Sequence, residues 1–166
     1  MAGVHTKTFT AHDDYMTPKH AWEAINHLIP KKIIWEPFYG DGQSGKYLEE
    51  LGHTVINEPR DFFTDPPKNW DIIVSNPPFS LAKDVMAKLL EYDKPFILLM
   101  PSAKINTSYI RDWNDKGLQI IIPRKRIQFI KLVNGIIPEN YKSCCNFDCF
   151  YYCYGIGLPS DIIWLQ

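Results

Sequence analysis

Two hydrophobic periodicities alternate along the first two-thirds of the chain. Short runs of consecutive apolar residues are typical of strands buried on both faces of a sheet. Between them, apolar residues recur every three or four positions, as they do on one face of a helix. The apolar runs predict strands at residues 31–36, 53–58, 70–75 and 94–101. The helical pattern predicts helices at residues 17–30, 44–52, 81–92 and 107–115, the first of them capped by Thr17.

This alternation of strand and helix predicts an α/β fold with a mostly parallel sheet. Three further strands, expected at residues 118–123, 127–132 and 147–155, follow one another with little helix between them. They predict antiparallel strands at the C-terminal edge of the sheet. Only twelve residues separate Glu58 from Asp71, and a parallel crossover needs about a dozen. The connection after the second strand is therefore either a reduced crossover, without an extra strand and helix, or a loop over the top of the sheet.

Composition and charge narrow the classes of protein to consider. The chain has 166 residues, 45% of them hydrophobic, which predicts a single domain over residues 1–166 with its own core. The formal net charge of −1 excludes a strongly basic protein, so a nucleic-acid contact must come from a local patch. No apolar run approaches the roughly 20 residues that cross a membrane, and the N-terminus lacks the apolar core of a secretory signal. We therefore expect a cytoplasmic protein with no membrane partner.

All four cysteines lie within ten residues, at Cys144, Cys145, Cys149 and Cys153. Their spacing lacks the paired C-x2-C units of a zinc site. The last two alternate with aromatic residues, which is typical of a buried strand in which cysteine acts as a small apolar side chain. We therefore expect core packing here and no metal.

A glycine-rich stretch, EPFYGDGQSGKY at residues 36–47, joins the first predicted strand to a helix. From Gly40 it matches both the dinucleotide pattern G-x-G-x-x-G and the phosphate-loop pattern G-x-x-x-x-G-K. The phosphate loop needs Ser or Thr at the position that Tyr47 occupies, so that interpretation is excluded. A plain tight turn between strand and helix remains an alternative, because the dinucleotide pattern alone is a weak signal.

The charges around this loop favour a cationic ligand. Glu58 lies 18 residues after Gly40, near the place where dinucleotide-binding folds carry a ribose-binding carboxylate. Glu36 and Asp41 flank the loop, and negative charge is unfavourable beside a pyrophosphate. The same charge suits a ligand that carries an ammonium and a sulfonium group.

The stretch SNPPFS, residues 75–80, follows the predicted strand at 70–75 and lies at the sheet edge where open α/β folds bind ligands. The Asn76 side-chain oxygen and a backbone carbonyl held by the prolines Pro77 and Pro78 can accept both hydrogens of a planar amino group. Phe79 offers a face on which the attached ring can stack. The motif suits an exocyclic amine on an aromatic base, although a Pro-Pro turn capped by Asn is an alternative.

Five motifs stand in one order along the chain: DDYMTP, EPFYGDG, INEPRDFF, SNPPFS and RKRIQF. In this series, which runs from Asp13 to Phe129, the chain resembles the S-adenosylmethionine-dependent DNA adenine-N6 methyltransferases, of the compact type often carried by phages. The resemblance implies a Rossmann-like class I methyltransferase fold. It also implies methyl transfer to the N6 amino group of adenine in DNA, with S-adenosylhomocysteine as product, in the host cytoplasm if a phage encodes the protein.

The resemblance implies a pocket for the methionine end of the cofactor. Thr17 would contact the cofactor carboxylate, and Tyr15 would lie near the body of the cofactor. Glu36 would face the amino group. Its neighbours in the loop, namely Pro37, Gly40 and Gly42, would shape the pocket.

The same resemblance also implies which residues bind the adenosine end of the cofactor and which bind the substrate. Glu58 would bind the ribose hydroxyls, Asp61 would accept from the adenine amino group of the cofactor, and Phe62 would pack on that ring. Asn76, which also borders the cofactor, would hold the target base together with Pro77, Pro78 and Phe79. The basic residues that would approach nucleic acid are Arg124, Lys125 and Arg126, and the alternative for them is a solvated basic turn before a strand.

Several alternatives remain open at this stage. Full-length relatives usually carry a separate target-recognition domain, for which 166 residues leave no room, so site selection would come from loops, from a dimer, or be weak. RNA adenine-N6 and protein glutamine-N5 methyltransferases share the N-P-P-Y/F motif, and a non-catalytic remnant that binds cofactor or nucleic acid is a further alternative. DNA is expected as the partner over RNA. A monomer and a homodimer are equally compatible with the sequence.

Overall fold

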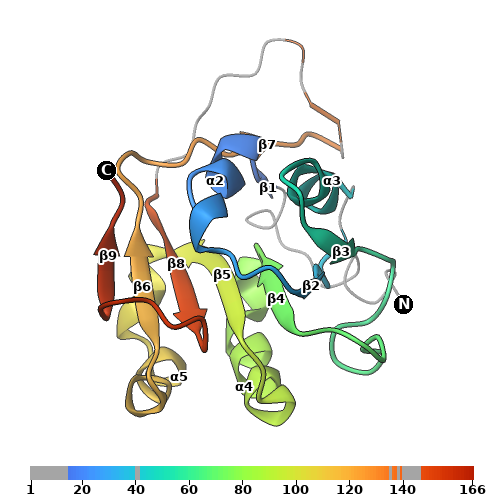
Figure 1. Ribbon diagram of the computed structural model, residues 1–166. Coiled ribbons are helices and arrows are strands. Elements are labelled where there is room, and N and C mark those ends of the chain that lie inside the picture. The colour runs from blue at the N-terminus through green and yellow to red at the C-terminus, as the bar shows by residue number, and fades with distance from the viewer. Residues whose placement is uncertain (1–14, 40–41, 135, 138, 140–146) are drawn as a thin grey trace.

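A seven-stranded sheet forms the centre of the computed structural model, which describes residues 15–39, 42–134, 136–137, 139 and 147–166. Its strands are β2 (Ile33–Trp35), β3 (Thr54–Ile56), β4 (Ile72–Ser75), β5 (Phe96–Pro101), β6 (Gln119–Ile122), β8 (Cys149–Tyr154) and β9 (Ile162–Trp164). The order across the sheet is β3-β2-β4-β5-β8-β6-β9 (Figure 1). The four strands predicted in the first two-thirds of the chain are all present and pair in parallel, as expected.

The C-terminal half of the sheet contains the expected change of direction. Strand β8 runs antiparallel to both of its neighbours, β5 and β6. The outermost strand, β9, pairs in parallel with β6. The mostly parallel α/β sheet with a C-terminal antiparallel element is confirmed, and the antiparallel strand β8 lies two places in from the edge strand β9.

Helices cover the two faces of this sheet separately (Figure 1). Helices α2 (Lys19–Glu23) and α3 (Gln43–Glu50) lie on one face, where Trp22 and Leu48 pack on Ile34 and Val74. Helices α4 (Ala82–Tyr92) and α5 (Ser108–Arg111) lie on the other, where a second cluster of buried residues forms around them. Short 3₁₀ turns complete the helical segments: η1 (Asn26–Leu28), η2 (Phe79–Leu81), η3 (Ser102–Asn106) and η4 (Asn114–Lys116).

The first helix is shorter than its hydrophobic pattern predicts. Helix α2 ends at Glu23, and the 3₁₀ turn η1 continues the segment. Ile25, Asn26 and His27 are weaker helix formers than the residues before them, which accounts for the early end. The prediction that Thr17 caps this helix is wrong, because Pro18 occupies the cap position and no side chain bonds to the helix start.

The connection after β3 is reduced, as the residue count predicts. Residues 57–71, all of which the structure describes, contain turns but neither helix nor strand. Strand β3 therefore stays at the edge of the sheet beside β2. The short connection still carries Asp61 and Phe62 inward, and both side chains are buried.

A separate two-stranded sheet joins the start of the described chain to the segment that follows β6. Strand β1 (Tyr15–Met16) pairs antiparallel with β7 (Ile130–Lys131). Of the strand predicted at residues 127–132, only Ile130 and Lys131 form a β-strand. The pairing lays the residues before α2 beside the end of the RKRIQF motif.

Candidate active site

The glycine loop and the NPPF motif meet at the carboxyl ends of two neighbouring strands. Glu36 directly follows β2, and Asn76 directly follows β4. The two strands pair in parallel, with Trp35 opposite Ile73. Because parallel neighbours end on the same side of a sheet, both motifs lie at one edge, which is where open α/β sheets hold ligands.

Glu36 is a buried carboxyl group with fixed partners. Its side chain is 2% exposed. Its Oε1 accepts hydrogen bonds from the Phe38 backbone N–H at 2.9 Å and from the Ser75 hydroxyl at 2.5 Å. Burial raises the pKa of Glu36 to about 8, although both hydrogen bonds act in the opposite direction. A cation beside this group would favour its ionised form.

The described part of the glycine loop shapes the space next to Glu36. Gly42 begins α3 with a φ of +80°, a left-handed conformation that favours glycine. Its backbone N–H donates to the Tyr39 carbonyl at 2.7 Å, and Pro37 is buried behind the carboxyl group. Gly40 and Asp41 lie outside the described residues.

Asn76 is held by a residue from the start of the chain. Its Nδ2 donates to the Thr17 hydroxyl at 2.8 Å, and Thr17 is only 4% exposed. The Asn76 Oδ1 is buried and accepts no hydrogen bond from any described residue. An unmet buried acceptor costs about 1–3 kcal/mol, so this oxygen is suited to receive a hydrogen from a ligand.

Aromatic rings close one side of this position. Phe79 meets Phe147 edge-on at 5.5 Å and Phe129 at 6.5 Å between ring centroids. Tyr15 meets the same two rings edge-on, at 5.5 Å and 6.4 Å. Phe129, the last residue of RKRIQF, is fully buried in this cluster. Asn76 is thus bonded to Thr17, and Phe79 shares an aromatic cluster with Tyr15, whereas the site roles of these residues and of Pro77 and Pro78 stay predictions.

Phe147 is a member of the site that sequence reasoning missed. It stacks on Phe129 with centroids 5.7 Å apart. The only signal for it was an aromatic residue just before the cysteine-containing strand β8, and that signal does not distinguish a site residue from a core residue.

The residues predicted to bind the adenosine end of the cofactor differ in their burial and in their partners. Glu58 is exposed, and its Oε2 accepts from Arg60 Nε at 2.6 Å. Asp61 is 5% exposed, and its Oδ1 accepts from the backbone N–H groups of Phe63 and Thr64. Phe62 is fully buried and packs on Trp35. The cofactor roles of these residues therefore stay predictions.

The three basic residues of RKRIQF are all exposed, and one of them, Arg126, is ion-paired. Arg126 Nε donates to Asp148 Oδ1 at 2.9 Å, and this hydrogen bond lowers the pKa of Asp148. Arg124 and Lys125 are exposed and form no ion pair with a described residue. They remain candidates for a nucleic-acid contact.

Cys149 and Cys153 are buried within β8, as expected for core packing, and burial raises the pKa of the Cys153 thiol. Cys144 and Cys145 lie outside the described residues. In the described part of the chain, no three His, Cys, Asp or Glu side chains gather as a metal site would require.

Among the described segments, no helix combines the length and the apolar character needed to cross a membrane.

Part of the chain is similar in sequence to known methyltransferases. Residues 64–111, which contain NPPF, match the family model described as adenine-specific methyltransferase EcoRI. A Type II methyltransferase of Mycoplasma genitalium is 30% identical over 93 residues, which cover 52% of this chain. The match covers 29% of that relative, so the chain spans under a third of the curated relative that it matches.

The fold has counterparts among solved structures. A candidate RNA methyltransferase from Pyrococcus horikoshii superimposes with a TM-score of 0.52 at 14% identity, over 92% of this chain and 94% of that one. A dimethyladenosine transferase from Plasmodium falciparum gives a TM-score of 0.46 at 11% identity, over 83% of this chain and 62% of that one. The superposition on the Pyrococcus structure and the order of the strands confirm the predicted Rossmann-like class I methyltransferase fold.

Proposed function

We propose that the chain transfers a methyl group from S-adenosylmethionine to the N6 amino group of adenine in DNA. The observation that carries the proposal is the Asn76 amide. It is anchored by the Thr17 hydroxyl and leaves a buried acceptor oxygen without a partner among the described residues. The class I fold and the family-model match over residues 64–111 support a methyltransferase.

The geometry suits an amine on an aromatic ring. The adenine amino nitrogen is a poor nucleophile because its lone pair is delocalised into the ring. Acceptance of its hydrogens by Asn76 Oδ1 and by a carbonyl of the proline turn favours charge build-up on nitrogen as it becomes sp³. Phe79 would hold the ring, and the orientation so obtained can contribute up to roughly 7–11 kcal/mol. A base in a duplex would first flip out, at a cost of a few kcal/mol.

The residues around Glu36 fit the methionine end of S-adenosylmethionine. A buried carboxyl with a raised pKa is a suitable partner for an ammonium group. Gly42 allows close approach of a ligand to the backbone, and Thr17 and Tyr15 border the same edge of the sheet. The cofactor brings an already activated methyl group on its sulfonium, so no metal or strong base is required of the protein.

DNA is proposed over RNA because the full series of motifs resembles the DNA enzymes. The same amide and ring would also hold adenine in RNA. Transfer of methyl groups to matched DNA and RNA strands of one sequence separates the two substrates.

The Asn76→Ala variant tests the role of the amide. We expect methyl transfer to fall at least about a hundredfold, since one lost transition-state contact of this kind costs about 10²–10³, while the affinity for S-adenosylhomocysteine changes only a few-fold. Asn69→Ala, an exposed asparagine in the connection between β3 and β4, is the matched control and should behave as the wild type. Undiminished transfer by Asn76→Ala would contradict the proposed role.

A further inference from the structure

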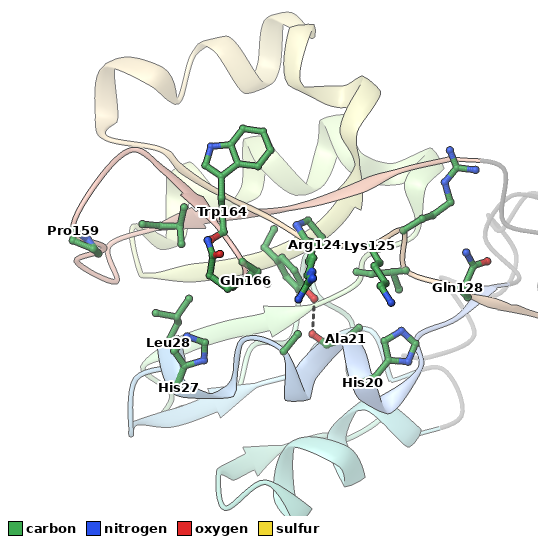
Figure 2. A pocket seen from close by; sticks show the side chains of 17 residues that line it. His20, Ala21, His27, Leu28, Arg124, Lys125, Gln128, Pro159, Trp164 and Gln166 are labelled. Carbon is green, nitrogen blue, oxygen red and sulfur yellow. Dashed lines mark hydrogen bonds between the residues drawn. The ribbon is translucent and has the colours of Figure 1, made fainter.

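A cavity of about 750 Å³ lies between α2, residues 123–128 and the C-terminal strand β9. Figure 2 shows it between α2, which carries His20 and Ala21, and the C-terminal residues, with Arg124 and Lys125 between them. We call it the basic pocket. Its volume falls within the range of roughly 300–1,000 Å³ that ligand pockets occupy.

The walls of the basic pocket are apolar and its charged groups are cationic. Ile163 and Leu165 face it from β9 and its end. Trp164, between them, also lines the pocket, and this residue is 67% exposed. Five lining residues are basic, namely His20, His27, Arg124, Lys125 and Arg126, and no described lining residue is Asp or Glu. An anionic ligand with an apolar body would complement these walls.

Both walls of the pocket continue into the candidate active site. His20 lies three residues after Thr17, which holds the Asn76 amide. On the other wall, Gln128 lines the pocket and the next residue, Phe129, meets the Phe79 ring. A strand that placed its base between Asn76 and Phe79 would therefore have the pocket directly beside it.

We propose that the basic pocket receives a second nucleotide of the substrate strand, close to the target adenine, and so contributes to recognition of the flanking sequence. Arg124 and Lys125 hold its phosphate, and the apolar walls receive its base. The side-chain amide of Gln166 offers hydrogen bonds to the base edge. This inference rests on the proposed function, because it takes the substrate to be a nucleic acid.

The first test combines a variant that fills the basic pocket with oligonucleotides that lack one base at a time. Ala24 lines the pocket and is exposed, so Ala24→Trp occupies the cavity without disturbing the core. Binding to the full chain is measured for single-stranded and duplex oligonucleotides with one adenine, each with an abasic site at one successive position, in the presence of S-adenosylhomocysteine. Ala87→Trp, at an exposed alanine of α4 on the other face of the sheet, is the matched control.

We expect one flanking position at which loss of the base weakens wild-type binding roughly tenfold, the order found when a single base contact is removed. Ala24→Trp should bind the intact oligonucleotide as weakly as the wild type binds the oligonucleotide that lacks this base. Removal of the base at this position should not weaken the binding of Ala24→Trp further. Ala87→Trp should keep the wild-type profile. An Ala24→Trp variant with wild-type affinity and the wild-type abasic profile would overturn the proposal.

The second test measures the phosphate contact and does not depend on the folding of Ala24→Trp. Each phosphate contact contributes about 0.7–0.9 to the slope of log affinity against log salt. Because Arg124 and Lys125 hold the same phosphate, the double variant Arg124→Gln/Lys125→Gln should lower the magnitude of this slope by about 0.7–0.9. Lys83→Gln/Lys116→Gln removes the same charge at two exposed lysines elsewhere and should leave the slope unchanged. An unchanged salt slope for Arg124→Gln/Lys125→Gln would contradict the proposal that Arg124 and Lys125 hold a phosphate.

Failure of the pocket and failure of the proposed function give different results. Efficient N6 methylation, with no effect of Ala24→Trp or of Arg124→Gln/Lys125→Gln on binding, would refute the pocket and leave the function standing. Binding that follows the predicted abasic and salt patterns, without methyl transfer from S-adenosylmethionine to any nucleic acid, would refute the function and leave the pocket standing.

Discussion

Two polar side chains, Glu36 and Asn76, define the chemistry of the site at the scale of single residues. Glu36 is 2% exposed, with a pKa raised by burial to about 8, so its carboxyl group carries a proton at neutral pH. Asn76 keeps a buried oxygen that accepts nothing from the described residues. Both arrangements are unfavourable in the free protein, and an ammonium group at Glu36 and an amine at Asn76 would offset them.

The protonation of Glu36 predicts that binding of S-adenosylhomocysteine releases a proton. At pH 7 a group of pKa about 8 is protonated in about 0.9 of the molecules, and a cation beside it lowers its pKa and favours the ionised form. Titration calorimetry in buffers of different ionisation enthalpy should therefore report release of up to about 0.9 proton per ligand at pH 7, and almost none at pH 9.

Two variants make this measurement specific. Glu36→Gln has no carboxyl group to ionise and should bind without releasing a proton. Glu49→Gln, an exposed position of α3, should release protons as the wild type does. A wild-type binding enthalpy that is the same in every buffer at pH 7 would show that Glu36 does not meet the ammonium group.

At the scale of elements, a side chain between α3 and β3 supports the position of Glu36. Asn57, just after β3, donates from Nδ2 to the Glu36 backbone carbonyl at 3.2 Å. Gly45 of α3 packs directly on it, and a Cβ at Gly45 would stand 2.4 Å from Asn57 Oδ1 and 2.6 Å from Asn57 Cβ. The glycine in the third position of this helix is therefore required by packing rather than by its backbone conformation.

Gly45→Ala is predicted to destabilise the protein, although alanine is favoured over glycine in a helix by about 1 kcal/mol. The forced shift of Asn57 should cost more, and we expect a net loss of about 1–3 kcal/mol in the free energy of unfolding. Denaturant unfolding measures it, with Glu49→Ala on the exposed side of α3 expected within about 0.5 kcal/mol of the wild type. A Gly45→Ala protein as stable as the wild type would contradict the packing argument.

The elements that the sequence predicted and those that it missed differ in length and in the range of their contacts. Strands β2, β3, β4 and β5 were predicted because each is an apolar run bounded by turn residues. Strand β1 was missed because two residues have no periodicity, and its partner β7 lies more than a hundred positions away. The Thr17 cap was predicted wrongly because its hydroxyl bonds to Asn76, 59 residues along the chain.

At the scale of the whole molecule, topology explains why the motifs converge. Glu36 and Asn76 were predicted to meet because they follow strands that were expected to be neighbours, and β2 and β4 are neighbours. Phe147 and the basic pocket could not be predicted, because both depend on contacts between segments far apart in the sequence, such as those of Phe147 with Phe129 and of residues 123–128 with α2 and the C-terminal residues. No local pattern encodes these contacts.

The most direct test of the central claim is analysis of the nucleosides that the protein modifies. The chain is incubated with S-adenosylmethionine and a mixture of unmethylated DNA and RNA, and the two pools are separated, digested and analysed by mass spectrometry. We predict N6-methyladenine in the DNA pool, dependent on the intact Asn76 side chain. N6-methyladenine in neither pool, or in the RNA pool alone, would contradict the proposed activity on DNA.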